Sequence, residues 1–471
     1  MTFQTFKRTK IVATIGPASR EPELLDRLIK AGVDAARLNF SHGRHEEHGE
    51  VIARVRQISA KYGRPVTVIA DLQGPKIRAG NLPLNGLTLK SGDEVKFVFG
   101  DDYVEGGPIP VQHDIAKHLK VGERLFLRDG LMEVEAVAVA DGVITGKVKS
   151  SGELFSHQGI NLPDTDMGGE ILTEKDQDDL KYILTQDVDY VALSFVQTAD
   201  DVANLRKWLV DNGSDAKVIA KIETAAAVRH LEAIAAVADG LMVARGDLAV
   251  ETSPQRVPVI QRRMIDLSRL AKIPVIVATQ MLESMISAPR PTRAEVADIA
   301  SAVMEGADAV MLSGETAMGA HPVDVVRVMA EVIVAVERDE LSRHEYDPTV
   351  FKNDSHINPI ASAAKELATR LGAKAIIAET ATGQTARNIS SLRPAELIVM
   401  VSHRARTYTQ LAIVWGAWSY LQTDPSLAAE TSIKGLKDTG RADVGDMVVV
   451  VSGSQQGIPG GTDSLKVEAV V

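Results

Sequence analysis

The stretch Lys217-Val218-Ile219-Ala220-Lys221-Ile222-Glu223 is a short run of apolar and β-branched residues that ends on a carboxylate. Such a run predicts a buried parallel strand. Segments of this kind recur along the chain, most of them separated by helix-length stretches. They are Lys10–Gly16, Ala35–Phe40, Thr67–Leu72, Tyr190–Phe195, Lys217–Ile222, Gly240–Gly246, Pro274–Thr279 and Ala307–Gly314. Because eight β–α units close a parallel barrel, the repetition predicts an α/β fold built on a (β/α)8 TIM barrel.

The composition is that of a soluble globular protein. Its 471 residues exceed what one core usually supports, so two or three domains are expected. A net charge of −11 argues against a general nucleic-acid binder, and the absence of cysteine excludes disulfides and cysteine nucleophiles. The N-terminus lacks the apolar core of a signal peptide, and no apolar run is long enough to span a bilayer. We therefore expect a cytoplasmic enzyme without a nucleic-acid or membrane partner.

An insertion interrupts the barrel pattern after its third strand. Residues 74–162 are rich in glycine, proline and alternating segments such as Glu133–Val139, which predict short antiparallel strands. We expect residues 1–73 and 163–345 to form the barrel, and residues 74–162 to form a small β-barrel domain. Because the insert leaves the catalytic face of the barrel, it can close over the site as a lid.

The end of the chain predicts a further domain. The polar region Ser342–His356 resembles a domain connection, and new strand patterns follow it. These patterns predict an open α/β sheet over residues 346–471. The expected strands are Ala375–Thr380, Glu396–Ser402, Asp446–Ser452 and Leu465–Val471.

Two carboxylates end neighbouring barrel strands. Glu223 and Asp247 fall at the C-terminal strand ends, where barrel enzymes carry their chemistry. Two carboxylates, completed by substrate and water oxygens, suit Mg²⁺ or Mn²⁺. Structural carboxylates tied to arginines are the alternative, but their shared position favours a metal.

Lys221 lies two residues before Glu223, so both side chains leave the same face of the strand. Its ammonium can neutralise charge on a phosphoryl group, or it simply pairs with a neighbouring carboxylate. The turn at Gly246 and Asp247 offers backbone N–H groups to a carboxylate or phosphate. The alternative is a turn without a ligand, since an isolated Gly-Asp sequence predicts only a turn. The hydroxyl of Thr279 can bond a substrate or position a water.

A second polar group surrounds Arg37. Arg37, Asn39 and Ser41 alternate along one strand, and Asp71 ends the next. Arg37 suits bidentate phosphate binding, and the oxygens of the other three suit a cation or an internal hydrogen-bond network. Of the remaining polar residues, His42 is expected in a polar loop contact, and Arg78 near a nucleotide phosphate or simply on the surface.

Taken together, these segments resemble the pyruvate kinase family, in the family's order and over nearly the whole chain. The matching motifs are Thr9–Ser19, Arg37–Gly43, Lys221–Glu223, Met242–Leu248, Ala278–Ser284, Pro291–Glu295 and Met311–Ala317.

The resemblance implies phosphoryl transfer from phosphoenolpyruvate to ADP, giving pyruvate and ATP in the last step of glycolysis, by a homotetramer. Glu223 and Asp247 would hold Mg²⁺, Lys221 would stabilise the transition state, and a second Mg²⁺ would arrive with ADP. The remaining residues divide into substrate ligands (Arg37 for phosphate, Gly246 and Asp247 for carboxylate, Thr279 near the protonated carbon) and nucleotide neighbours (Thr14, Pro17, His42, Arg78).

The chain departs from the family pattern after its third strand. Leu72, Gln73 and Lys76 stand where many relatives have Thr, Lys and Glu. Potassium-dependent members hold K⁺ with oxygens at positions equivalent to Asn39, Ser41, Asp71 and 72. A lysine ammonium can replace that cation, and this pattern resembles the potassium-independent branch. We therefore expect activity without K⁺. The alternative is a solvent-facing Lys76 with K⁺ still bound.

A possible effector site follows the strand at Ala375–Thr380. Hydroxyls and backbone N–H groups at a helix N-terminus bind phosphate, and the family binds phosphorylated effectors here. The residues concerned are Thr380, Thr382, Gly383, Gln384 and Thr385, with Ser452–Gly457 as a second loop. An ordinary capped turn is the alternative. Gln158, where many relatives have lysine, leaves the lid's nucleotide contacts open.

Two other functions fit parts of the sequence. A barrel aldolase or lyase could enolise pyruvate on a metal held by similar carboxylates, but it needs neither the insert nor Arg78. The other is a catalytically dead metabolite sensor. A sensor could have lost any of the candidate catalytic residues, yet this chain keeps Lys221, Glu223, Asp247 and Thr279.

Overall fold

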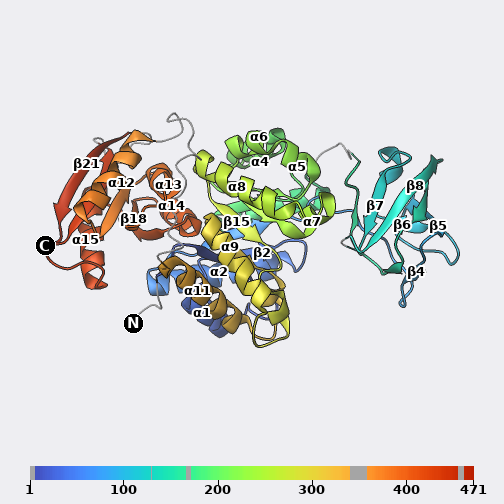
Figure 1. The fold of residues 1–471 in the computed structure, drawn as a ribbon, viewed down its shortest axis with the longest axis horizontal. Helices are drawn as coiled ribbons and strands as arrows, with labels where there is room; N and C mark the ends of the chain where they lie inside the picture. The colour runs from blue at the N-terminus through green and yellow to red at the C-terminus, as the bar shows by residue number, and fades with distance from the viewer. Residues whose placement is uncertain (1–5, 129, 166–170, 340–357, 454–460) are drawn as a thin grey trace.

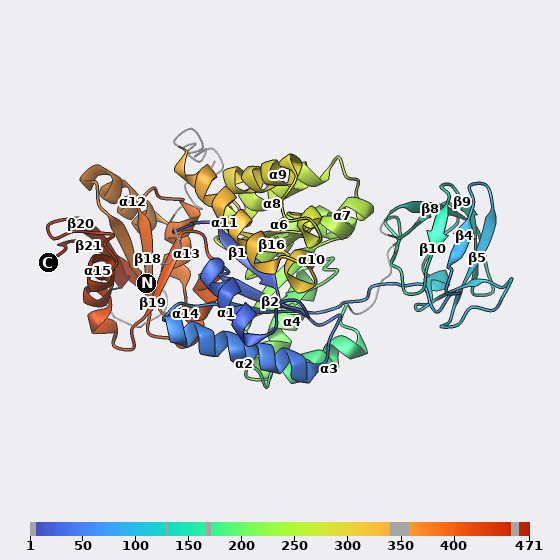
Figure 2. The same cartoon turned by 90° about the horizontal axis from the view of Figure 1, so that it is seen from below.

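The computed structural model describes residues 6–128, 130–165, 171–339, 358–453 and 461–471. Figures 1 and 2 show three units in a row, with the barrel between the inserted domain and the C-terminal domain. The expected connection at Ser342–His356 lies outside the described residues. None of the described helices has the length and apolarity needed to cross a membrane.

Eight parallel strands close into the predicted barrel, in the order β1-β16-β15-β14-β13-β12-β3-β2. They are almost wholly buried because helices cover their outer faces and apolar side chains fill the interior. The strands are β1 (Lys10–Thr14), β2 (Ala35–Asn39), β3 (Thr67–Asp71), β12 (Tyr190–Leu193), β13 (Lys217–Ile222), β14 (Gly240–Ala244), β15 (Val275–Ala278) and β16 (Ala309–Leu312).

Amphipathic helices follow the barrel strands and turn their apolar faces to the sheet. They are α1 (Pro22–Ala31), α2 (His45–Tyr62), α3 (Glu174–Ile183), α4 (Ala199–Asp211), α5 (Ala225–Arg229), α6 (Leu231–Val237), α7 (Arg245–Glu251), α8 (Val257–Ala271), α9 (Arg293–Glu305), α10 (Gly314–Ala317) and α11 (Pro322–Arg338).

The insert after β3 consists of β-strands, as its alternating pattern predicts, with one short 3-10 turn at Ile115–Lys117. A six-stranded sheet, in the order β11-β7-β8-β9-β5-β6, and the pair β10-β4 form a half-barrel around a core that includes Phe97 and Leu125. It stands away from the strands' C-terminal ends (Figure 2). Its strands are β4 (Leu87–Leu89), β5 (Glu94–Phe99), β6 (Ile109–Val111), β7 (Arg124–Leu127), β8 (Met132–Ala140), β9 (Val143–Val148), β10 (Gly152–Leu154) and β11 (Ile160–Asn161).

The C-terminal domain is an open sheet in the order β19-β18-β17-β20-β21, with only β21 antiparallel. The sequence pattern predicts four of its five strands and misses β19, a short edge strand. Its elements are α12 (Pro359–Leu371), β17 (Ala375–Glu379), α13 (Gln384–Ser391), β18 (Leu397–Ser402), α14 (Ala405–Gln410), β19 (Ala417–Leu421), α15 (Ala428–Asp438), β20 (Met447–Gly453) and β21 (Thr462–Ala469).

The C-terminal domain closes the N-terminal end of the barrel. Ile413 is fully buried against Tyr190 and the other residues that fill the barrel interior. The buried carboxylate of Asp189, just before β12, forms ion pairs with Arg56 of α2 (Nη2–Oδ2 2.7 Å) and Arg406 of α14 (Nη1–Oδ1 3.3 Å). The C-terminal strand ends, at the opposite end of the barrel, are therefore left to the inserted domain and to any substrate.

Candidate active site

Lys221 lies at the centre of a buried ionic network. From the end of β13 its ammonium is 3.1 Å from Asp71 Oδ1, 3.0 Å from Glu223 Oε1 and 2.6 Å from Ser194 Oγ. Burial alone would lower the pKa of Lys221, but the charges of Asp71 and Glu223 raise it above its ordinary value. Lys221 therefore carries a fixed positive charge at neutral pH.

Arg37 joins this network through the other oxygen of Asp71. Its Nε lies 2.6 Å from Asp71 Oδ2, and its Nη1 donates to Thr14 Oγ1 at 3.0 Å. Burial opposes ionisation of Asp71, yet the neighbouring Arg37 and Lys221 hold its pKa below the usual range. The network thus brings together Thr14, Arg37, Asp71 and Lys221, all predicted from the sequence.

Glu223 is buried just beyond the end of β13. Its Oε2 accepts the backbone N–H of Phe195 at 2.7 Å, which fixes the carboxylate. Burial raises the pKa of Glu223, and the nearby charge of Asp247 adds to the effect. A divalent cation bound by both carboxylates would offset this repulsion between like charges.

The donor set fits a metal that also takes substrate oxygens. In the part of the chain that the structure describes, no group of three or more His, Asp or Glu side chains gathers as a complete metal site. Glu223 and Asp247 alone would leave open positions on an octahedral ion, as the sequence predicts for Mg²⁺ or Mn²⁺.

Lys76, at the start of the insert, reaches the second of these carboxylates. Its ammonium lies 3.1 Å from Asp247 Oδ1 and 3.5 Å from Oδ2, and both side chains are about one-fifth exposed. Asn39 and Ser41 lie elsewhere at the mouth and bond to one another, since Asn39 Oδ1 accepts the Ser41 N–H at 3.2 Å. Ser41 follows the end of β2 and is not part of that strand.

Backbone N–H groups face the mouth at the first turn of α7. The N–H groups of a first helical turn have no partner within the helix, and Gly246 donates to Thr279 Oγ1 at 3.1 Å. Thr279, with φ of 71°, lies just beyond β15 in the left-handed region, which few non-glycine residues adopt. Arg245 holds this turn by donating to the Thr279 carbonyl at 2.5 Å. The predicted neighbours Gly246, Asp247 and Thr279 therefore do meet.

Of the four predicted nucleotide residues, Thr14 belongs to the buried network and the other three lie further out. Pro17 and His42 are exposed on the loops after β1 and β2, and the His42 carbonyl accepts from His48 Nε2 at 2.9 Å. Arg78 donates to the His157 carbonyl at 2.9 Å within the insert. Gln158 caps its own loop, because its Oε1 accepts the Phe155 N–H at 3.0 Å.

The insert touches the helix that carries Asp247. Asn161 of β11 donates to Glu251 Oε1 at 3.2 Å, at the last residue of α7. Burial raises the pKa of Glu251 to about 7, and the charges of Asp247 and Glu223 add to it. This contact and the Lys76–Asp247 pair tie both ends of the insert to α7.

Sequence analysis missed three residues of the site, namely Ser194, Phe195 and Glu251. Ser194 follows β12, so the strand-end rule already contained the signal for it; its hydroxyl donates to the Leu72 carbonyl at 2.7 Å. Phe195 contributes a backbone N–H, in a conformation with φ of 55° that the sequence does not reveal.

The predicted effector loop lies in the C-terminal domain, which covers the end of the barrel opposite the mouth. Thr380 Oγ1 accepts the Gly383 N–H at 2.9 Å, and the Thr385 hydroxyl lies 2.6 Å from that of Thr462 on β21. Arg387 donates to the backbone carbonyl of Thr382 at 3.3 Å and to Gln384 Oε1 at 3.1 Å. Of the second loop, Ser452 and Gly453 end β20, and residues 454–457 lie outside the described residues.

Two family models match the chain. One, described as the barrel domain of pyruvate kinase, matches residues 6–326, and the other, its alpha/beta domain, matches residues 358–468. A pyruvate kinase of Agrobacterium vitis is 40% identical over 475 residues, 99% of each chain. Pyruvate kinase 2 of Synechocystis is 39% identical over 98% of this chain and 79% of its own.

Solved structures agree with the sequence matches. The crystal structure of a pyruvate kinase from Cryptosporidium parvum has a TM-score of 0.90 to this chain at 33% identity, covering 99% of this chain and 96% of that one. With the barrel, the inserted domain and the network around Lys221 in place, these full-length similarities show that the chain belongs to the pyruvate kinase family.

Proposed function

We propose that the network around Lys221 transfers the phosphoryl group of phosphoenolpyruvate to ADP, with Mg²⁺ held by Glu223 and Asp247. The observation that carries this proposal is the convergence of Lys221, Arg37 and two carboxylates at the C-terminal end of one barrel. Phosphoryl transfer needs in-line positioning and neutralisation of negative charge, and the network supplies fixed cationic groups for both.

Each cationic group has a distinct task. Arg37 binds the phosphoryl oxygens, because its guanidinium is held at the barrel mouth by Asp71 and Thr14. Lys221 faces the group in transfer, and its raised pKa keeps it charged throughout. Preorganised by hydrogen bonds, these charges require little reorganisation during the reaction.

The carboxylate of the substrate would lie at the first turn of α7. The N–H of Asp247 points toward the start of the helix, and that of Gly246 is shared with Thr279. Because Thr279 accepts this N–H, its own hydroxyl proton is available to the carbon that becomes the methyl group of pyruvate or to a bridging water. When bound, the divalent ion would polarise the phosphoryl oxygens and offset their charge.

We also propose that the reaction needs no K⁺. Leu72 is buried and offers no side-chain oxygen, while both oxygens of Asp71 are already engaged by Arg37 and Lys221. Lys76 places a tethered ammonium at the same mouth, bound to Asp247. A permanent cation there would replace the electrostatic effect of a bound monovalent ion.

The family further supports regulation by a phosphorylated effector at Thr380–Thr385, assembly as a homotetramer and a cytoplasmic location. The effector loop combines hydroxyl groups with the N-terminus of α13, a combination suited to phosphate. Its contact with Thr462 of β21 would carry a change in the loop to the edge of the C-terminal sheet.

The test is pyruvate formation from phosphoenolpyruvate and ADP at increasing Mg²⁺, in wild type and in Glu223→Gln. We expect activity that requires Mg²⁺, and a variant with weaker apparent Mg²⁺ affinity and kcat lower by about two orders of magnitude or more. Mg²⁺-independent activity, or an unchanged Mg²⁺ dependence in the variant, would contradict the assignment.

A further inference from the structure

Two helices on the outside of the barrel hold the loop that follows β2. The loop runs from Phe40 to Gly43, between the end of β2 and the start of α2, and carries Ser41 and His42. Its first peptide group is fixed to the barrel, since the Phe40 N–H donates to the Asp71 carbonyl at 2.9 Å. Beyond that point it is tied to α2 and α3, which lie next to one another (Figure 2).

His48, near the start of α2, provides the first of these ties. Its Nε2 lies 2.9 Å from the His42 carbonyl, and its ring stacks on that of Phe40 with the centroids 4.4 Å apart. The side chain is buried, and burial lowers the pKa of His48, so the imidazole is neutral at neutral pH. Because a carbonyl oxygen only accepts, the proton of the neutral ring lies on Nε2.

Lys175 of α3 provides the second tie. Its ammonium donates to the Phe40 carbonyl at 2.6 Å and to Asp179 Oδ2 at 2.6 Å. Asp179 is buried, and its other oxygen lies 2.7 Å from His45 Nε2 on α2. The ring of His45 also stacks on that of Tyr182 of α3, with the centroids 4.4 Å apart. The two helices are thus joined to one another as well as to the loop.

Gly43 shows how closely the loop approaches His48. The φ of Gly43 is 78°, in the left-handed region, and a Cβ atom at this position would lie 3.3 Å from His48 Nε2. Both the backbone conformation and the close approach favour glycine. The residue after the His42 carbonyl is therefore one that lets this carbonyl reach the imidazole.

We propose that His48 and Lys175 are positioning residues for the nucleotide, because they hold the loop Phe40–Gly43 in the conformation that ADP contacts. The inference rests on the proposed transfer to ADP and on the expected place of His42 beside the nucleotide. Both residues act through the backbone of the loop, since each donates to one of its carbonyl oxygens.

The phosphoenolpyruvate side of the site is held by other contacts. Arg37 is fixed by Asp71 and Thr14. Lys221 is fixed by Asp71 and Glu223. Loss of either tie to the loop should therefore weaken the binding of ADP more than that of phosphoenolpyruvate. A role in folding alone would lower the amount of active enzyme, and with it the apparent kcat, without separating the two KM values.

Steady-state pyruvate formation tests the proposal, with ADP and phosphoenolpyruvate varied in turn. His48→Phe keeps an aromatic ring against Phe40 and removes the donor, and Lys175→Met removes the ammonium. We expect each variant to raise KM for ADP about fivefold to tenfold, with KM for phosphoenolpyruvate within about twofold of wild type. Lys181→Met, which removes an exposed lysine of α3, is the matched control and should behave as wild type does.

A conservative variant separates the hydrogen bond of His48 from its packing. His48→Gln loses the ring but keeps an N–H donor on its amide, so its KM for ADP should be lower than that of His48→Phe. A His48→Gln variant that is no better than His48→Phe would overturn the proposal. So would an unchanged KM for ADP in both His48→Phe and Lys175→Met, or an equal rise in both KM values.

Equilibrium dialysis of radiolabelled ADP with Mg²⁺ separates this inference from the proposed function, because it measures Kd without turnover. A wild type that binds ADP but forms no pyruvate would contradict the proposed reaction, while weaker ADP binding by His48→Phe would still support the positioning role. Equal Kd values in wild type and His48→Phe would refute that role. Thermal unfolding identifies a His48 variant that fails to fold, in which case Lys175→Met, at a half-exposed position, carries the comparison.

Discussion

The ammonium of Lys76 lies 3.1 Å from Oδ1 of Asp247, so an ion pair joins the start of the inserted domain to the helix that bears the proposed metal ligand. The charge that we propose in place of K⁺ is therefore bound at the mouth of the barrel, on one of the two proposed metal ligands. It also competes with the divalent ion for the same carboxylate.

Replacing Lys76 should restore a need for K⁺. We expect Lys76→Gln to lose about tenfold or more of kcat in potassium-free buffer, and K⁺ to recover part of that loss. The apparent Mg²⁺ affinity should rise, because Asp247 loses its cationic partner. Steady-state rates across K⁺ and Mg²⁺ concentrations check both effects. Lys76→Arg is the control that keeps the charge; full activity of Lys76→Gln without K⁺ would contradict the role.

Removing the charge of Lys221 should abolish most of the turnover. We expect Lys221→Met to lower kcat by about 10²- to 10³-fold, with a smaller effect on KM, because the charge is needed most in the transition state. The change also removes the ammonium next to the buried Glu223 and leaves Asp71 with Arg37 as its cationic partner, so thermal unfolding must be measured alongside.

Lys217, at the other end of the same strand, provides the matched control for Lys221. Burial, with the nearby Arg387 charge, lowers the pKa of Lys217 to about 7, so Lys217→Met removes only about half a positive charge at neutral pH, at the end of the strand away from the site. Its kcat should stay within a few-fold of wild type. A similar loss in both variants would mean that a lysine anywhere on β13 matters only for folding.

Glu251 should make the metal-free protein less stable as pH rises. Burial raises its folded-state pKa to about 7 from the ordinary 4.5, so between these values the folded chain holds a proton that the unfolded chain has released. The free energy of unfolding contributed by Glu251 therefore falls by at most about 3 kcal/mol between about pH 4.5 and pH 7. Above pH 7 it is constant.

The measurement is the thermal midpoint in EDTA at pH 5 and pH 8. Glu251→Gln should reduce the fall in midpoint between these pH values and keep an acceptor for Asn161. Glu94→Gln, at an exposed position of the insert, should behave as wild type. An identical pH dependence of Glu251→Gln and wild type would show that the carboxyl titrates normally.

The effector loop makes a separate prediction. We expect Thr382→Ala combined with Thr385→Ala to weaken the response to activating or inhibiting sugar phosphates and nucleotides by about tenfold in effector concentration. Dose–response curves at subsaturating phosphoenolpyruvate measure this. Unchanged responses to every such compound would remove the loop from consideration as an effector site.

The barrel and the position of the two carboxylates that we propose as metal ligands could be predicted from the strand pattern. Glu223 follows β13 directly, and Lys221 precedes it by two residues, so period-two geometry places both on one face. Asp247 lies in the first turn of α7, just after the adjacent strand β14. The edge strand β19 escaped detection because Ala417–Leu421 is short and its buried face carries the small residues Ala417 and Ser419, while its larger side chains are partly exposed.

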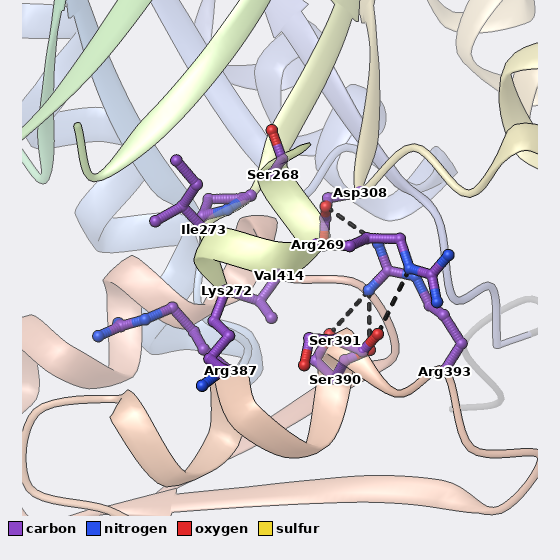
Figure 3. A pocket seen from close by; sticks show the side chains of 11 residues that line it. Ser268, Arg269, Lys272, Ile273, Asp308, Arg387, Ser390, Ser391, Arg393 and Val414 are labelled. Atoms are coloured by element: carbon purple, nitrogen blue, oxygen red, sulfur yellow. Dashed lines mark hydrogen bonds and ion pairs between the residues drawn. The ribbon is translucent and has the colours of Figure 1, made fainter. Parts of the chain in front are cut away.

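Other parts of the site depend on tertiary contacts that no local pattern encodes. Lys76 lies in a linker whose sequence says nothing about the distant Asp247, and the two meet only because the insert folds back on α7. The N–H of Phe195 reaches Glu223 through a left-handed backbone conformation at a residue other than glycine. The small cavity between Ser268–Pro274 and Arg387–Arg393 likewise combines residues from two domains (Figure 3).

The most direct test of the account is pyruvate formation from phosphoenolpyruvate and ADP with Mg²⁺, in rigorously potassium-free buffer and again after K⁺ is added. We predict full activity in the first buffer and little change in the second. Activity that appears only with K⁺ would leave the phosphoryl-transfer site intact and contradict the role of Lys76. No activity in either buffer, with sugar phosphate and nucleotide effectors supplied, would contradict the proposed reaction.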